Sequence, residues 1–130
     1  MKTAPIRVLL ADDDEAFVRS LRELIDSQPE LEVVAAAADG VQAIELADAN
    51  QVHAAVVDLH MPRLDGVSTV ARLRKDHPAL CLIVLTGDDD PTLHTAALEA
   101  GADAVLQKHE LAERLIERLG RVHANGEGRT

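Results

Sequence analysis

Residues 6–15 read IRVLLADDDE, an apolar run that ends abruptly at four acidic residues. The run is too short for an independent helix, and apart from Arg7 it is apolar at consecutive positions, as is typical of a strand buried in a parallel sheet. Four more runs of the same kind follow along the chain: Leu31–Ala36, Ala54–Val57, Cys81–Leu85 and Ala104–Leu106. Together the runs predict five buried strands.

The segments between these runs have helical spacing. One apolar stripe comprises Phe17, Leu21, Leu24 and Ile25, and another comprises Leu111, Leu115, Leu119 and Val122. Asp90 followed by Pro91 predicts a helix start, and Gly101 predicts a helix end. Because right-handed crossovers lay helices across a parallel sheet, this alternation predicts an α/β fold with a doubly wound, parallel, five-stranded sheet.

Length and charge limit the kinds of partner. A chain of 130 residues has room for one domain, and 47% hydrophobic with 28% charged residues is typical of a folded one. The net charge of −10 repels nucleic-acid phosphates, so we expect no direct nucleic-acid binding. The lone Cys81 excludes an internal disulfide, and no run is long enough to cross a membrane. We therefore expect a cytoplasmic location.

Acidic residues stand where two of the predicted strands end. Asp12 and Asp13 follow the first strand, and Asp58 follows the third. Ligands of open parallel sheets bind at the carboxyl ends of strands, where the strand order reverses, so neighbouring strands would bring these carboxylates together. Two carboxylates about 4 Å apart repel by roughly 4 kcal/mol at an effective dielectric near 20. A bound cation relieves this repulsion, and oxygen ligands with room for water favour Mg²⁺.

Thr86 and Lys108 follow the fourth and fifth strands on the same side. A metal ion and a lysine can neutralise phosphoryl oxygens while a carboxylate attacks phosphorus. No evident general base is present to activate water, which favours transfer to the protein itself. An acidic helix start is the alternative reading of residues 12–15. That alternative accounts for Asp14 and Glu15, but not for the polar residues at the other strand ends.

Four segments in order carry a family resemblance: Val8–Asp14, Val56–Gly66, Val84–Gly87 and Ala100–Lys108. From about Ile6 to Val122 the chain resembles the receiver domains of two-component response regulators. The resemblance implies a flavodoxin-like (βα)5 fold with strand order 2-1-3-4-5. It implies a receiver domain over residues 1–123, with residues 124–130 as a flexible tail or the start of a linker.

The resemblance also assigns roles. Asp58 matches the phosphoacceptor, which takes a phosphoryl group from a sensor histidine kinase or a phosphotransfer protein. Asp13, Asp58 and the backbone carbonyl of His60 match the ligands of Mg²⁺, and Asp12 would act through a bound water.

Other matched positions concern the phosphoryl group and the backbone. Thr86, Lys108 and the backbone amide of Gly87 match the groups that hold phosphoryl oxygens. Gly66 matches a glycine that permits a tight turn after Met61 and Pro62.

Two positions depart from the family pattern. Val105 stands where the family often has Tyr or Phe, and Phe17, the only aromatic residue, falls in the first predicted helix. An aromatic rotamer switch is therefore unavailable, and we expect the signal to pass through the Thr86 loop and the helix after it. His109 follows Lys108 where many receivers have proline. The helix-turn-helix class of regulators often lacks that proline, which favours a longer transcriptional regulator of that class.

The sequence thus predicts a phosphorylation-dependent switch that shifts a pre-existing equilibrium, and not an enzyme beyond self-phosphorylation and self-dephosphorylation. An output domain, a downstream protein partner and a homodimer stay open. One alternative is an aspartyl-phosphate hydrolase, whose common motif needs an acidic residue where His60 stands. Another is a non-phosphorylated interaction module, in which loss of Asp12, Asp13, Thr86 or Lys108 is expected.

Overall fold

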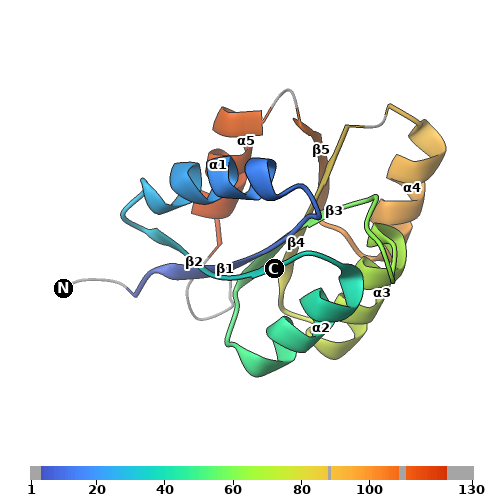
Figure 1. The fold of residues 1–130 in the computed structure, drawn as a ribbon, viewed down its shortest axis with the longest axis horizontal. Helices are drawn as coiled ribbons and strands as arrows, with labels where there is room; N and C mark the ends of the chain where they lie inside the picture. Colours follow the sequence, from blue (N-terminus) through green and yellow to red (C-terminus); the bar gives the residue numbers. More distant parts are fainter. Residues whose placement is uncertain (1–3, 88, 109–110, 123–130) are drawn as a thin grey trace.

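The computed structural model describes residues 4–87, 89–108 and 111–122, and over these residues five strands alternate with five helices (Figure 1). The elements are β1 Ile6–Ala11, α1 Glu15–Asp26, β2 Leu31–Ala37, α2 Gly40–Ala49, β3 Ala54–Asp58, α3 Gly66–Asp76, β4 Cys81–Thr86, α4 Pro91–Ala100, β5 Ala104–Gln107 and α5 Leu111–Gly120. The predicted strands are confirmed to within one residue at each end. His109 and the predicted tail at 124–130 lie outside the described residues.

The strands form one parallel sheet in the order β2-β1-β3-β4-β5. Figure 1 shows α1 and α5 on one face of the sheet and α2, α3 and α4 on the other. The predicted doubly wound fold is therefore confirmed. The chain steps from β1 outward to β2 and then returns to place β3 on the other side of β1. The strand order reverses there, so the carboxyl ends of β1 and β3 border the position where such sheets bind ligands.

Two apolar layers hold the helices on the sheet. Val8 and Leu10 of β1 belong to the layer under α1 and α5, whereas Leu9 and Ala11 belong to the layer under α2, α3 and α4. Successive strand residues point to opposite faces, so a strand covered on both sides must be apolar throughout. All residues of β3 and β4 are buried, which explains the unbroken apolar runs. No helix of the described residues has the length and hydropathy to span a membrane.

Aspartates begin four of the helices. The side chains of Asp14, Asp39, Asp65 and Asp90 each accept a hydrogen bond from a backbone amide in the first turn of the helix that follows. These bonds satisfy amides that have no partner within the helix. The predicted start of α4 at Asp90 and Pro91 is confirmed, and so is its end at Gly101, whose φ of 122° favours glycine.

Gly66 serves a different purpose from the tight turn that the resemblance implied. Within residues 4–87, 89–108 and 111–122, positive φ occurs at Gly101 and at Arg63, whose φ is 67°, so Arg63 makes the left-handed turn after Pro62. Gly66 instead packs against β3, where an added Cβ would collide with the carbonyl oxygen of Asp58 and lie 2.5 Å from Cα of Leu59. The glycine therefore allows the start of α3 to approach the end of β3.

A single arginine joins several elements at the amino-terminal edge of the sheet. The guanidinium of Arg74 in α3 donates to the carbonyl oxygens of Leu80 and Gly101 and forms an ion pair of 3.0 Å with Asp103. The same carboxylate oxygen of Asp103 accepts a bond from the amide of Leu82. This cluster, the Arg74 clamp, fastens α3 to the start of β4 and to the carboxyl end of α4.

Candidate functional site

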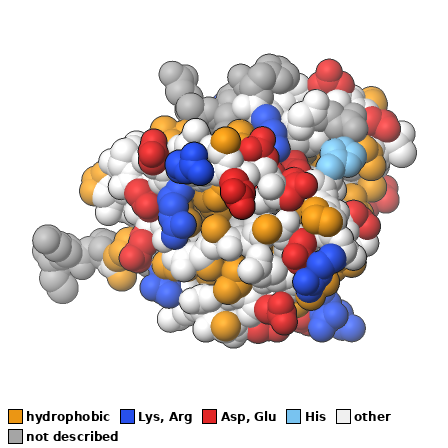
Figure 2. Space-filling view, viewed as in Figure 1, with side chains coloured by type: hydrophobic (Ala, Val, Ile, Leu, Met, Phe, Trp, Pro, Cys, Tyr) orange, Lys and Arg blue, Asp and Glu red, His pale blue; other side chains and the backbone are white. Residues whose placement is uncertain are grey.

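Three carboxylates meet at the carboxyl ends of β1 and β3. The parallel register pairs Ala11 with Val57, so Asp12 and Asp58 emerge side by side. Oxygens of Asp12, Asp13 and Asp58 lie within 4.8 Å of one another. Asp12 and Asp58 are 7% and 6% exposed, whereas Asp13 is exposed. Acidic side chains gather with a basic one on the corresponding part of the surface in Figure 2.

The backbone after β1 fixes the first of these carboxylates. The amide of Asp12 donates to the carbonyl of Ala37 in β2 at 3.0 Å. One carboxylate oxygen of Asp12 accepts a bond of 2.9 Å from the amide of Asp14, and Asp14 in turn caps α1 by accepting from the amide of Phe17. The acidic helix start therefore explains Asp14, while Asp12 is directed towards Asp58.

Lys108 follows β5 and faces the carboxylates. Its Nζ lies 2.8 Å from Oδ2 of Asp12 and 3.4 Å from Oδ1 of Asp58. Burial opposes the charge on this ammonium, but the two carboxylates outweigh burial and raise the pKa of Lys108. The lysine is therefore cationic at neutral pH.

The cluster nevertheless carries excess negative charge. Burial, and then the charge of Asp12, raise the pKa of Asp58, although Lys108 and a hydrogen bond from the backbone amide of His60 oppose them. Oδ2 of Asp12 is fully buried and, apart from its ion pair with Lys108, has no hydrogen-bond partner among the described residues. Carboxylate oxygens with room for water suit a small hard cation. The donor set therefore fits Mg²⁺.

A cavity of about 610 Å³ opens beside the carboxylates. The residues that line it are Asp12, Asp13, Asp14, Asp58, His60, Gly87, Asp89 and Lys108. Every predicted site residue is in this set except Thr86, which is fully buried at the end of β4 and pairs in register with Gln107 of β5. Thr86 stands at the predicted strand end, directly before Gly87, but its side chain does not line the cavity.

Phe17 also belongs to the site, although no local sequence pattern predicts it there. The centroid of its ring lies 4.4 Å from Nζ of Lys108, within the range of a cation–π interaction. The ring also lines a void, too small for a water molecule, that borders Asp12 and Asp58. The available signal was that this chain has one Phe and no Trp or Tyr, and that Phe17 stands four residues after Asp13.

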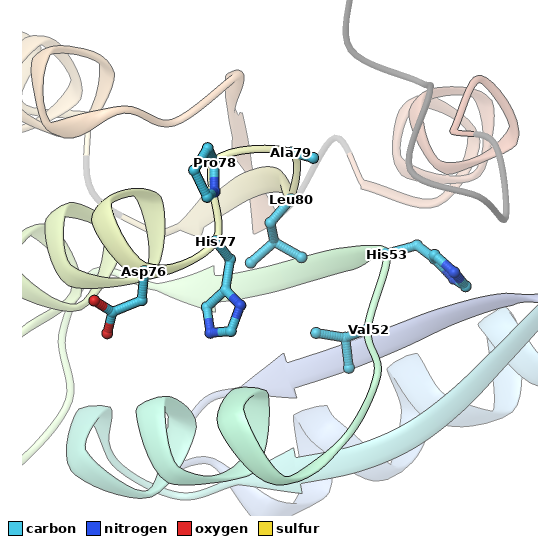
Figure 3. Close-up of a pocket in the computed structure, with 7 residues that line it drawn as sticks. All are labelled: Val52, His53, Asp76, His77, Pro78, Ala79 and Leu80. Carbon is cyan, nitrogen blue, oxygen red and sulfur yellow. The ribbon is translucent and has the colours of Figure 1, made fainter.

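A second cavity, of about 290 Å³, lies before β3 and β4, at the opposite edge of the sheet. Figure 3 shows its lining, with the ring of His53 pointing away from that of His77. His77 pairs with Asp48 at 2.9 Å, and Nδ1 of His53 accepts a bond from the backbone amide of Arg7. The two imidazoles thus have separate partners and do not share a ligand position.

Comparison with known proteins decides the family. The sequence model of the family named response regulator receiver domain matches residues 8–120 of this chain. The chain belongs to this family. Response regulator MprA of Mycobacterium sp. (strain KMS) is 39% identical over 115 residues, which are 88% of this chain and 49% of that protein. Protein-glutamate methylesterase/protein-glutamine glutaminase 4 of Myxococcus xanthus is 40% identical over 109 residues, 83% of this chain and 31% of that protein.

Solved receiver domains share the fold. The signal receiver domain of a NarL response regulator from Mycobacterium tuberculosis superimposes with a TM-score of 0.86 at 25% identity, covering 97% of this chain and 99% of that one. This chain spans about a third to a half of the length of the curated relatives named above. The receiver domain described here is therefore a component of two-component signalling.

Proposed function

We propose that this receiver domain accepts a phosphoryl group on Asp58 and so acts as a phosphorylation-dependent switch. The observation that supports this role is the position of the Asp58 carboxylate, which is buried at the end of β3, within 4.8 Å of oxygens of Asp12 and Asp13 and 3.4 Å from the ammonium of Lys108. A nucleophile, a set of metal ligands and a counter-charge for phosphoryl oxygens are thus together on one cavity wall.

The proposed donor is the phosphohistidine of a sensor histidine kinase or a phosphotransfer protein. A carboxylate oxygen of Asp58 attacks phosphorus, the new oxygen–phosphorus bond forms, and the nitrogen–phosphorus bond of the donor breaks. The donor imidazole leaves with the electron pair of that bond and takes up a proton. The product is an acyl phosphate on Asp58.

The site would hold Mg²⁺ through Asp13, Asp58 and the backbone carbonyl of His60, with Asp12 acting through a water. When bound, this ion neutralises charge on the carboxylates and on the phosphoryl oxygens. Lys108 offers its ammonium to a phosphoryl oxygen, and the amide of Gly87, which lines the cavity, offers a hydrogen bond. Thr86 would reach the phosphoryl group only if its buried side chain turned towards the cavity.

The signal would leave the site through the loop after Thr86 and through α4. Val105 is half-buried and aliphatic, so no ring at this position can report the state of Thr86. Ala97 is the one described residue of α4 that is fully buried, and Leu98 beside it is 49% exposed. Amide shifts across residues 86–106 that stay unchanged on phosphorylation would contradict this route.

The whole protein is proposed to be a longer regulator in which residues 1–123 form the regulatory domain and an output domain or a downstream protein carries the response. The absence of proline after Lys108 favours a helix-turn-helix output. A homodimer is compatible with this assignment.

Intact-mass spectrometry tests the proposed function. After incubation with acetyl phosphate and Mg²⁺, the wild type is expected to gain one phosphoryl group, and Asp58→Ala is expected to gain none. Asp89→Asn is the matched control, because Asp89 also lines the cavity but is exposed, and it is expected to be phosphorylated like the wild type. Steady phosphate release without accumulation would favour the hydrolase, and no reaction at all would favour the interaction module.

A further inference from the structure

The one phenyl ring of this chain lies over the ammonium of Lys108, the one lysine or arginine among the described residues that line the cavity. Nζ of Lys108 is 4.4 Å from the centroid of Phe17 and 2.8 Å from Oδ2 of Asp12. The ammonium therefore contacts an aromatic ring as well as the carboxylates. The two residues come from opposite ends of the chain, from the first turn of α1 and from the end of β5.

The position of the ring is determined by the same turn that places a carboxylate. The amide of Phe17 donates to the side chain of Asp14 at 3.1 Å, and the amide of Asp14 donates to the side chain of Asp12 at 2.9 Å. Asp12 and the backbone of Phe17 are therefore linked through the two hydrogen bonds that Asp14 makes. A shift of α1 that displaced the ring would also disturb a carboxylate of the site.

Packing alone does not require an aromatic residue here. Phe17 is half-buried beside an aliphatic layer that includes Leu21 and Ile25, and a leucine would supply similar apolar surface. What the ring adds is its negative face, which attracts a cation. Lys108 has a flexible side chain beside a cavity of about 610 Å³, so its ammonium can turn towards water. Attraction to the ring of Phe17 opposes that movement.

We propose that Phe17 is a positioning residue, which holds the ammonium of Lys108 at the place where phosphoryl oxygens arrive. This inference rests on the proposed phosphorylation of Asp58. When Asp58 carries a phosphoryl group, Lys108 exchanges its carboxylate contact for a phosphoryl oxygen, and Phe17 keeps it close to both positions.

The test compares three chains: the wild type, Phe17→Leu and Phe17→Tyr. Phosphorylation by acetyl phosphate is timed at saturating Mg²⁺, and the dissociation constant for Mg²⁺ alone is measured separately. Phe17→Leu is expected to slow phosphorylation by about three- to tenfold, while Phe17→Tyr stays within about twofold of the wild type. Leu24→Ala, at the far end of α1, loosens the same apolar layer and is expected to leave the rate unchanged.

The affinity for Mg²⁺ separates positioning from general damage. A lysine released from Asp12 and Asp58 competes less with a cation, so Phe17→Leu is expected to bind Mg²⁺ as tightly as the wild type or more tightly. In NMR spectra the ε-methylene protons of Lys108 are expected to be shifted upfield by the ring in the wild type and in Phe17→Tyr, and to lose that shift in Phe17→Leu.

Three results would overturn the inference: a wild-type rate in Phe17→Leu, an equal loss in Phe17→Tyr, or a loss of Mg²⁺ affinity in proportion to the loss of rate. If the wild type itself gains no phosphoryl group, the proposed function fails and the positioning role fails with it. That outcome is distinct, because it is recorded before any variant is compared.

Discussion

Asp58→Asn is expected to make the unliganded domain more stable, although it removes the proposed phosphoacceptor. At an effective dielectric near 20, charges at most 4.8 Å apart repel by about 3.5 kcal/mol or more, and Asp58 faces two such carboxylates. The attraction between Oδ1 of Asp58 and Nζ of Lys108, which are 3.4 Å apart, offsets about 5 kcal/mol of this repulsion. Asp12 alone does not outweigh this attraction, and the repulsion from the exposed Asp13 is screened, so the unfavourable balance depends on burial, the first cause of the raised pKa of Asp58. A rise of one in that pKa corresponds to about 1.4 kcal/mol, so we expect the ionised carboxylate to cost about 1–2 kcal/mol.

Urea unfolding in EDTA at pH 7 measures the difference. Because the chain has no Trp or Tyr, far-UV circular dichroism is the suitable signal. Asp58→Asn is expected to raise the free energy of unfolding by about 1–2 kcal/mol. Asp89→Asn, at an exposed position of the same cavity, is expected to change it by less than about 0.5 kcal/mol. Equal or lower stability of Asp58→Asn would refute the charge balance described above.

Mg²⁺ and pH give two further controls on the same variant. Mg²⁺ at a hundred times its dissociation constant is expected to stabilise the wild type by about 2.7 kcal/mol and Asp58→Asn by less. The pKa of Asp58 is raised above 3.8, so the folded state binds its proton at a higher pH than the unfolded chain does. The free energy of unfolding of the wild type relative to Asp58→Asn therefore falls as pH rises through that interval, and the difference disappears below pH 3.8.

Three other perturbations are expected to affect stability. Burial, and then the charge of Arg7, lower the pKa of His53, so the unfolded chain takes up a proton that the folded one resists. Urea midpoints of the wild type should fall as pH decreases below 6.5, and the fall should be smaller in His53→Gln. Arg74→Met removes the ion pair of Asp103, which keeps its bond from the amide of Leu82, and removes the guanidinium bonds to the carbonyls of Pro78, Leu80 and Gly101. The change is expected to cost about 2–3 kcal/mol of unfolding free energy, also measured by urea titration. Gly66→Ala is expected to cost about 1–3 kcal/mol and to lower the melting temperature, because its Cβ meets the backbone of Asp58. No change in any one of these variants would contradict the contact assigned to it.

The strands and the carboxylate cluster could be predicted because both depend on local pattern. A strand covered on both faces must be apolar at every position, and β3 and β4 are. The position of Asp58 at the end of such a strand then follows from counting along the chain, and parallel pairing brings it to Asp12. The caps at Asp90 and Gly101 were predictable for the same reason, since each acts within one helical turn.

Contacts between distant segments could not be predicted in this way. No local pattern relates Phe17 to Lys108, or Arg74 to Asp103, because each pair depends on how helices sit on the finished sheet. Gly66 shows a related limit. A glycine marks either a left-handed turn or a close approach, and only the packing of α3 against β3 distinguishes the two.

The Arg74 clamp has a consequence for how α4 could move. Arg74 donates two hydrogen bonds to the carbonyl of Gly101, directly after the last turn of α4. The first turn of α4 lies at the other edge of the sheet, where β3 ends at Asp58. Because the Arg74 clamp fastens this end, a displacement of α4 that keeps the Arg74 bonds is a pivot about Gly101. α4 has ten residues and is about 15 Å long, so a tilt of about 10° about Gly101 would move its first turn by roughly 2.5 Å.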